Sequence, residues 1–265
     1  MEDFLELPNG VTPATEVFIG KRLPLSEMPN FFSFQPDEVK YGLQALLKWS
    51  GAAGGKEAAG VLFKGVNGDT KFRDLTVGSE TSVNILTTDL SRLSPDEARI
   101  KLKEISDGDV FSRFVDRRFV LISEQYPDVD SKIEGAILEK GKDIYGSVHV
   151  HPSGTPPNGH DLAILLFGDT GSIEGVICGD KHYIMVASKE MSHYEIEQTD
   201  DGKGGLSNTL SDYGDKIDSE TKLLVATTRS TMVEAARSSL TKYCKINSVG
   251  LYEGSLETNV YKRII

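Results

Sequence analysis

Two histidines stand two residues apart in the segment Tyr145–Pro152, which reads YGSVHVHP. The pattern around them predicts a strand over residues 144–151, and residues two apart on a strand point to the same face. His149 and His151 therefore project side by side, about 6–7 Å apart at Cα, and can converge on one metal ion. Pro152 cannot donate a ladder hydrogen bond, so we expect the strand to end there, at a sheet edge or cleft.

A carboxylate, Asp161, follows after nine residues that include three prolines and two glycines. Such a loop can reverse direction and return the carboxylate to the histidines. Two imidazoles and one carboxylate leave a fourth position open for water, which is typical of a catalytic zinc site. Taken alone, a His-x-His pair more often represents two half-buried histidines on a strand. The metal hypothesis therefore depends on Asp161 and on a second motif upstream.

Two motifs almost ninety residues apart carry a resemblance to a known family. HVHPSG at 149–154, with two prolines and NGHD at 158–161, resembles the HxHP, proline-rich loop and SxxD signature of the JAMM (MPN+, JAB) metalloproteases. The HPSG form is similar to the prokaryotic branch. Upstream, EAAGVL at 57–62 resembles the ExxGxL segment of that family. The resemblance covers roughly residues 36–190, with a diverged stretch at 78–130.

The resemblance implies His149, His151 and Asp161 as zinc ligands and Glu57 as general acid/base. The family usually has serine where this chain has Asn158, and that serine supports the oxyanion of the tetrahedral intermediate. The Asn158 amide can donate to the same oxygen, but an asparagine here fits a turn or helix cap equally well. The loop before Asp161 is also one residue shorter than is usual in the family.

Other candidate side chains have simpler interpretations. Glu134 and Glu139 lie within a predicted amphipathic helix at 130–142, where a charged face is ordinary, so Glu57 is preferred. We interpret His160 as a surface loop histidine. Cys178 and Cys244 form no CxxC pair and fit idle thiols in a reducing compartment, which leaves nitrogen and oxygen as metal ligands.

Helices and strands alternate along the chain, which predicts an α/β or α+β sandwich. The resemblance implies an MPN/JAB-like (cytidine-deaminase-like) sandwich, with a central, mainly antiparallel sheet flanked by helices. We expect helices at 36–50, 95–105, 130–142, from 161 onward, and 231–243. We expect strands at 57–63, 71–77, 118–123, 144–151, 173–178, 182–188, 246–252 and 256–264, with an Asn67-Gly68 turn. The predicted divisions are a lead-in at 1–34, a core at 35–198 with an insertion-like 78–130 segment, and a C-terminal extension at 199–265.

The charge balance constrains the partners. With 29 basic and 40 acidic residues the net charge is −11, which disfavours nucleic acid and suits a basic protein partner. No apolar run approaches the roughly 20 residues that span a bilayer. The acidic start, Met1-Glu2-Asp3, lacks the pattern of a secretory signal. We therefore expect a cytoplasmic protein that is not attached to a membrane.

Together these features predict a zinc-dependent hydrolase. The family typically cleaves an isopeptide or peptide bond at the C-terminus of ubiquitin or a ubiquitin-like protein. Processing of a small sulfur-carrier protein or of a cysteine-containing metabolite is an enzymatic variant. The alternatives are a non-catalytic MPN scaffold and a DNA-repair-associated JAB-domain protein, the latter disfavoured by a pI near 5.0.

Overall fold

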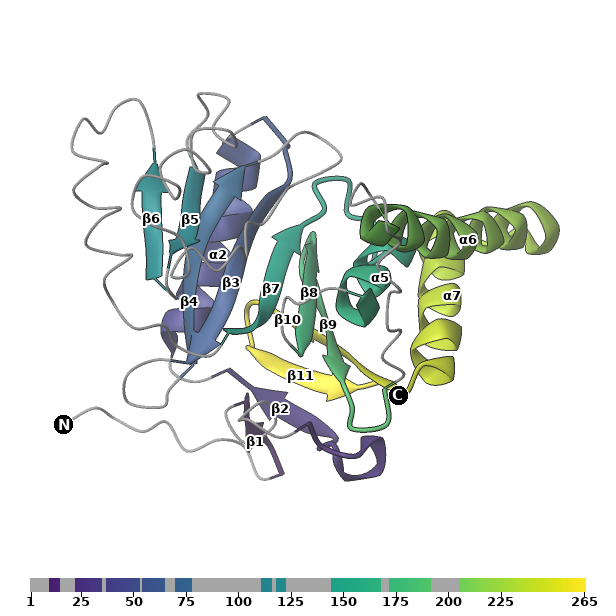
Figure 1. Ribbon diagram of the computed structural model, residues 1–265, viewed down its shortest axis with the longest axis horizontal. Helices are drawn as coiled ribbons and strands as arrows, with labels where there is room; N and C mark the ends of the chain where they lie inside the picture. Colours follow the sequence, from purple (N-terminus) through teal and green to yellow (C-terminus); the bar gives the residue numbers. More distant parts are fainter. Residues whose placement is uncertain are drawn as a thin grey trace.

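The described residues of the protein form one strongly twisted, eleven-stranded sheet (Figure 1). A computed structural model describes residues 10–14, 22–34, 37–52, 54–64, 70–77, 111–115, 118–122, 144–167, 172–191 and 205–265. The strand order is β1-β2-β11-β10-β9-β8-β7-β3-β4-β5-β6. Among these neighbours, only β1 with β2 and β7 with β8 pair in parallel. The sheet is therefore mainly antiparallel, as predicted.

The elements of the described residues have the following bounds. The strands are β1 Thr12–Pro13, β2 Phe31–Ser33, β3 Ala58–Lys64, β4 Thr70–Val77, β5 Phe111–Val115, β6 Arg118–Ile122, β7 Ile144–Val150, β8 Ile173–Cys178, β9 Lys181–Ala187, β10 Val249–Ser255 and β11 Val260–Arg263. The helices are η1 Leu25–Glu27, α2 Asp37–Ala52, α5 Gly159–Phe167, α6 Gly205–Thr228 and α7 Met232–Ile246. Within this described part, no helix combines the length and apolarity needed to cross a membrane.

Helices cover both faces of the sheet, because alternate strand residues belong to two different cores. On one face α2 packs against β3, β4 and β7. Val148 and Val150 of β7 join that core. On the other face α5 packs against β8 and β9, and Leu162 of α5 shares a second core with Tyr183 and Met185. The α/β class is thus confirmed. Val148 and Val150 point to the face of the sheet that α2 covers, whereas His149 and His151 point to the opposite face.

Helix α2 positions the start of β3. Val39, Leu43 and Leu46 are buried at helical spacing and fix the helix on the sheet. After the helix, Gly54 and Gly55 have φ of 79° and 81°, a left-handed conformation that favours glycine. The Ser50 hydroxyl donates to the Lys56 carbonyl (2.6 Å), which closes the turn. Glu57 therefore emerges from a defined turn directly before β3.

Both outer segments of the chain contribute strands to the same sheet. β10 pairs with β9 over its whole length, and β11 pairs with β2 from the N-terminal segment. Helices α6 and α7 pack against each other, α6 packs on α5, and α7 packs on β10. One sheet thus contains strands from all three predicted segments, 1–34, 35–198 and 199–265. The boundaries between these segments stay predictions.

Most elements predicted from sequence are present within a few residues, but α6 is an addition. Its sequence is rich in Ser, Thr, Asp and Gly and hides a stripe of Tyr213, Ile217, Thr221 and Leu224, which are buried or half-buried. That spacing is the helical signal that could have found it. The strands β1, β2 and β5 were also not predicted. The helices expected at 95–105 and 130–142 and the Asn67-Gly68 turn lie outside the described residues.

One buried histidine belongs to the core rather than to the histidine pair. His182 is completely buried, and its Nδ1 lies 2.7 Å from the hydroxyl of Tyr261. Burial lowers the pKa of His182 to about 3. Between pH 6.5 and 3 the unfolded chain binds a proton at this residue and the folded chain does not, so the free energy of unfolding falls as the pH falls.

We predict that His182 lowers the free energy of unfolding by about 2 kcal/mol between pH 7 and pH 5, because over this range His182 takes up a proton only in the unfolded state. Urea unfolding of the wild type and of His182→Gln at both pH values measures this. The wild type should lose about that much more than the variant. Equal losses would show that His182 titrates normally in the folded protein.

Candidate metal centre

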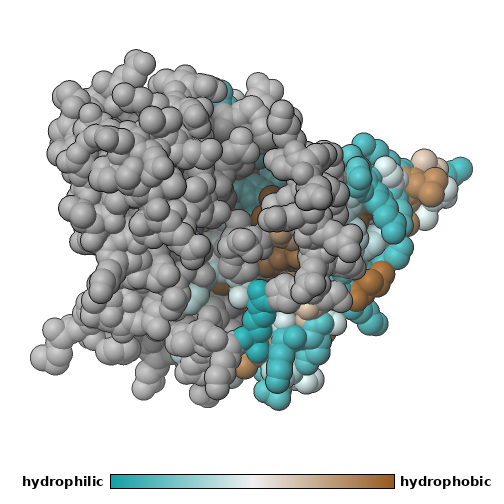
Figure 2. Space-filling model, in the orientation of Figure 1, coloured by the Kyte–Doolittle hydropathy of each residue, from teal (hydrophilic) through white to brown (hydrophobic). Residues whose placement is uncertain are grey.

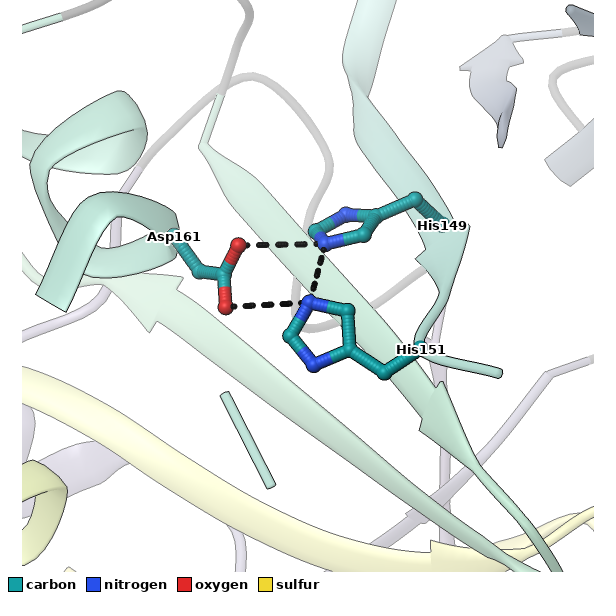
Figure 3. A group of neighbouring side chains, drawn as sticks. All are labelled: His149, His151 and Asp161. Atoms are coloured by element: carbon teal, nitrogen blue, oxygen red, sulfur yellow. Dashed lines mark hydrogen bonds and ion pairs between the residues drawn. The ribbon is translucent and has the colours of Figure 1, made fainter. Parts of the chain in front are cut away.

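His149, His151 and Asp161 form a buried cluster on the face of the sheet that α5 covers (Figure 3). The histidines come from the end of β7, and the carboxylate comes from the first turn of α5. The two Nε2 atoms lie 3.0 Å apart. Asp161 Oδ1 lies 3.0 Å from His149 Nε2, and Oδ2 lies 3.5 Å from His151 Nε2. Three ligand atoms from two elements therefore face one point.

The donor set fits a small divalent ion. Zinc binds imidazole nitrogen and carboxylate oxygen at about 2.0–2.2 Å in a tetrahedron, which requires neighbouring donors about 3.3 Å apart. The two imidazole nitrogens lie 3.0 Å apart, and Asp161 Oδ1 lies 3.0 Å from the nitrogen of His149, both close to that value. Among the described residues three protein donors converge, and a fourth position would remain for water or substrate. The cluster could thus hold a metal ion of the type that leaves one site open.

Each histidine is oriented by a hydrogen bond at its other ring nitrogen. His149 Nδ1 lies 3.0 Å from Oε1 of Glu174 on β8, and the Ser147 hydroxyl donates to Oε2 of the same carboxylate. His151 Nδ1 lies 3.0 Å from the carbonyl oxygen of Thr155. Both acceptors place the proton on Nδ1 and leave Nε2 facing the cluster, an arrangement that metal-binding histidines almost always have.

The beginning of α5 holds the carboxylate in place. The backbone amide of Asn158 donates to Asp161 Oδ2 (2.7 Å). The side-chain oxygen of Asn158 accepts from the amides of His160 (2.8 Å) and Asp161 (3.2 Å). Asn158 is therefore the cap of α5, which was one of its two interpretations. A role for its amide group at an oxyanion stays a prediction.

Glu57 approaches the cluster from the neighbouring strand. Ala59 of β3 pairs with His149, and the same antiparallel register continued by two residues sets Glu57 opposite His151. Directly opposite residues point to the same face of a sheet. Burial raises the pKa of the half-buried Glu57, and the charges of His149, His151 and Asp161 act on it as well. The structure thus brings the upstream glutamate beside the three candidate ligands.

The electrostatics of the cluster favour a positive charge between its members. Burial opposes ionisation of His149, but Asp161 and Glu174 outweigh it and hold the pKa of His149 well above its usual value. Burial likewise opposes the charge on Asp161, yet the imidazoles hold the pKa of its carboxyl far below its usual range. Burial raises the pKa of Glu174. Two buried carboxylates next to two imidazoles therefore favour the binding of a cation between them.

Helix α6 clamps the N-terminus of α5. Asp218 Oδ1 accepts from the Gly159 amide (2.8 Å), and Oδ2 pairs with His160 Nδ1 (3.1 Å). Gly159 permits this close packing, because a Cβ there would lie 2.3 Å from the Gly214 carbonyl oxygen. His160, with a side chain 43% exposed, is turned to these acids of α6, and Asp215 is its second partner (3.5 Å).

Sequence reasoning missed Glu174, Ser147 and Asp218 as supporting residues. Glu174 had one signal, since it is a single charge in the otherwise apolar strand IEGVIC. Asp218 had none, because α6 itself was not predicted. Cys178 and Cys244 are free, buried thiols outside the cluster, as expected for idle cysteines.

Comparison with known proteins does not identify a family. No protein-family model, no curated protein and no solved structure matches this chain.

We predict that Glu174→Gln weakens binding of a divalent ion about 10–100-fold, because a neutral amide polarises His149 less than a carboxylate does. Competition with a chromophoric chelator, using Zn²⁺ and Co²⁺, measures the affinity. Glu253→Gln, on the surface between Lys181 and Arg237, is the matched control and should bind like the wild type. Unchanged affinity in Glu174→Gln would show that the charge of Glu174 does not support the metal centre.

We also predict that Asp218→Ala weakens ion binding about tenfold, because the variant loses both bonds that hold the start of α5 and hence Asp161. Asp215→Ala is the control, since Asp215 pairs with the outer nitrogen of His160, Nε2, at 3.5 Å. The same competition assay applies. Equal affinities for the two variants would show that α6 does not position the carboxylate.

Proposed function

We propose that this chain is a zinc-dependent hydrolase of the JAMM type, which cleaves an isopeptide or peptide bond at the C-terminus of a ubiquitin-like protein. The observation that supports it is the approach of Glu57 to His149, His151 and Asp161. In this arrangement the turn before β3, the end of β7 and the first turn of α5 supply, in chain order, a glutamate, two histidines and an aspartate. That is the order of the ExxGxL, HxHP and SxxD motifs.

Zinc is the ion that best suits the donors. Nitrogen and carboxylate donors with no sulfur, three in number, are typical of catalytic zinc sites that keep one position for water. Other first-row ions accept the same donors, and zinc is proposed because the donor separations suit a small tetrahedral shell. When bound, zinc would lower the pKa of a water ligand toward neutrality and polarise the carbonyl of the substrate.

Glu57 supplies the proton transfers. Its carboxylate accepts a proton as water attacks the scissile carbonyl, and it returns that proton to the nitrogen when the C–N bond breaks. The products are a carboxylic acid and an amine, so the protons balance. Partial burial, which raises its pKa, suits a group that must both accept and donate. The Asn158 amide group is proposed to donate to the developing oxyanion, while its carbonyl oxygen caps α5.

The fold is proposed to be the MPN/JAB-like sandwich. Strands β7 and β8 pair in parallel within the mainly antiparallel sheet, and α5 is the crossover helix that connects them. The histidines lie at the carboxyl end of β7 and the aspartate in the first turn of the crossover helix. Active sites of α/β sheets lie at the carboxyl ends of strands that carry such crossovers, and the cluster occupies that position.

A ubiquitin-like substrate is proposed from the resemblance and from charge. The net charge of −11 suits a basic partner surface. This electrostatic part predicts that raising the salt concentration weakens binding of a basic ubiquitin-like protein, measured by titration calorimetry. An affinity that does not depend on salt would contradict the electrostatic part of the proposal and would leave the proposed metal centre unaffected.

We predict that Glu57→Gln lowers hydrolysis about 10²–10⁴-fold and leaves the metal content unchanged, because glutamine cannot carry the proton and does not ligate the ion. The assay uses a panel of ubiquitin-like proteins with a fluorogenic amide at the C-terminus. Chelation of the wild type should abolish the same activity. Hydrolysis that survives either change would contradict the proposed mechanism.

A further inference from the structure

A small pocket lies directly beside the candidate metal centre. It has a volume of about 180 Å³ and lies between the loop at 155–159 and the helices α6 and α7. Figure 1 shows these helices together with α5 at one side of the sheet. Its walls are mainly apolar: Pro156, Pro157, Ile217, Met232, Ala236 and Leu240. Pocket and cluster thus share the loop that connects β7 to α5.

Two residues of the shared loop both line the pocket and form hydrogen bonds with members of the cluster. Thr155 lines the pocket and accepts from His151 through its carbonyl, and Asn158 lines it and donates to Asp161 through its amide. One layer of backbone therefore separates the pocket from the cluster.

The pocket is graded from an apolar floor to a polar mouth. Ile217 and Leu240 are buried at 2% and 1% exposure, whereas Lys222 and Met232 are exposed. Asp218 and Thr221 lie between them in the wall formed by α6. An apolar side chain can fill such a floor while the polar groups at the mouth bond to backbone amides and carbonyls. Figure 2 agrees with this setting, because the surface along α6 is mostly hydrophilic.

We propose that this pocket is a specificity subsite that takes one apolar side chain of an extended substrate segment next to the scissile bond. The inference rests on the proposed function and names a feature of its substrate. A drug-sized ligand or cofactor needs about 300–1,000 Å³. An apolar cavity of about 150 Å³ holds a benzene-sized group. At about 180 Å³ this pocket suits a leucine, methionine or phenylalanine side chain.

Ala236 is the residue with which to test the pocket. It is half-buried on α7 and lines the pocket, so Ala236→Leu fills the space without removing a core side chain. Ser238→Leu is the matched control, because Ser238 is exposed on the same helix and is not part of the lining. Both variants should bind Zn²⁺ like the wild type, which shows that the neighbouring site is intact.

The probes are extended hexapeptides in which one position at a time is occupied by Leu, Ala, Lys or Glu. Binding is measured by fluorescence anisotropy on zinc-loaded protein in the Glu57→Gln background, so that no probe is cleaved. We expect the Leu peptide to bind about tenfold more tightly than the Ala peptide at one of these positions. That preference should disappear in Ala236→Leu and persist in Ser238→Leu.

The outcomes separate the subsite from the hydrolase. A Leu preference that survives Ala236→Leu, or a preference for Lys or Glu, overturns the subsite. A Leu preference lost only in Ala236→Leu supports the subsite even if the Glu57-containing protein cleaves no substrate, in which case only the hydrolase proposal fails. Absence of any preference at every position also overturns it.

Discussion

The burial of negative charge beside β7 is the constraint on which the rest of the structure depends. Asp161 and Glu174 are both almost completely buried, at 4% and 1% exposure. An isolated buried carboxylate is strongly destabilising unless a positive charge or several hydrogen bonds compensate for it. Here the compensation consists of two imidazoles, the amide of Asn158 and the hydroxyl of Ser147. A divalent ion at the centre would complete it.

That constraint explains why so many separate segments meet at one place. The register of β7 must put both histidines on the α5 face, since a slip of one residue would bring Val148 and Val150 there instead. Pairing with β8 brings Glu174 opposite Ser147, and pairing with β3 brings the start of that strand, directly after Glu57, beside His149. The clamp of α6 on the start of α5 then fixes the carboxylate. The C-terminal helices are thus part of the support of the site, although they are distant from it in sequence.

The sequence predicted the centre of this arrangement and missed its periphery. His149 and His151 could be placed on one face because strand periodicity is local, and Asp161 because a Pro/Gly loop can return. Glu174 could not be assigned, because its contact with His149 requires the pairing of β7 with β8, a long-range event. The strands β1 and β2, two and three residues long, are too short to show any period.

The case of α6 shows a different limit. Its polar composition hid a helix that packs on α5 and lines the pocket, so both Asp218 and the pocket were absent from the predictions. Asn158 shows a third limit, because sequence left two roles open and the geometry supplies one of them, the cap, through its side-chain oxygen. Its amide group is a different set of atoms, and a cap does not exclude the second role.

The metal content of the protein decides whether the buried cluster is a metal centre. Elemental analysis of the purified wild type, alongside His151→Ala, measures whether the buried cluster binds zinc. We expect about one zinc ion per chain in the wild type and almost none in the variant, because removal of one of three donors leaves an incomplete site. Wild-type protein without zinc even after incubation with excess Zn²⁺, or zinc retained in full by His151→Ala, would contradict it.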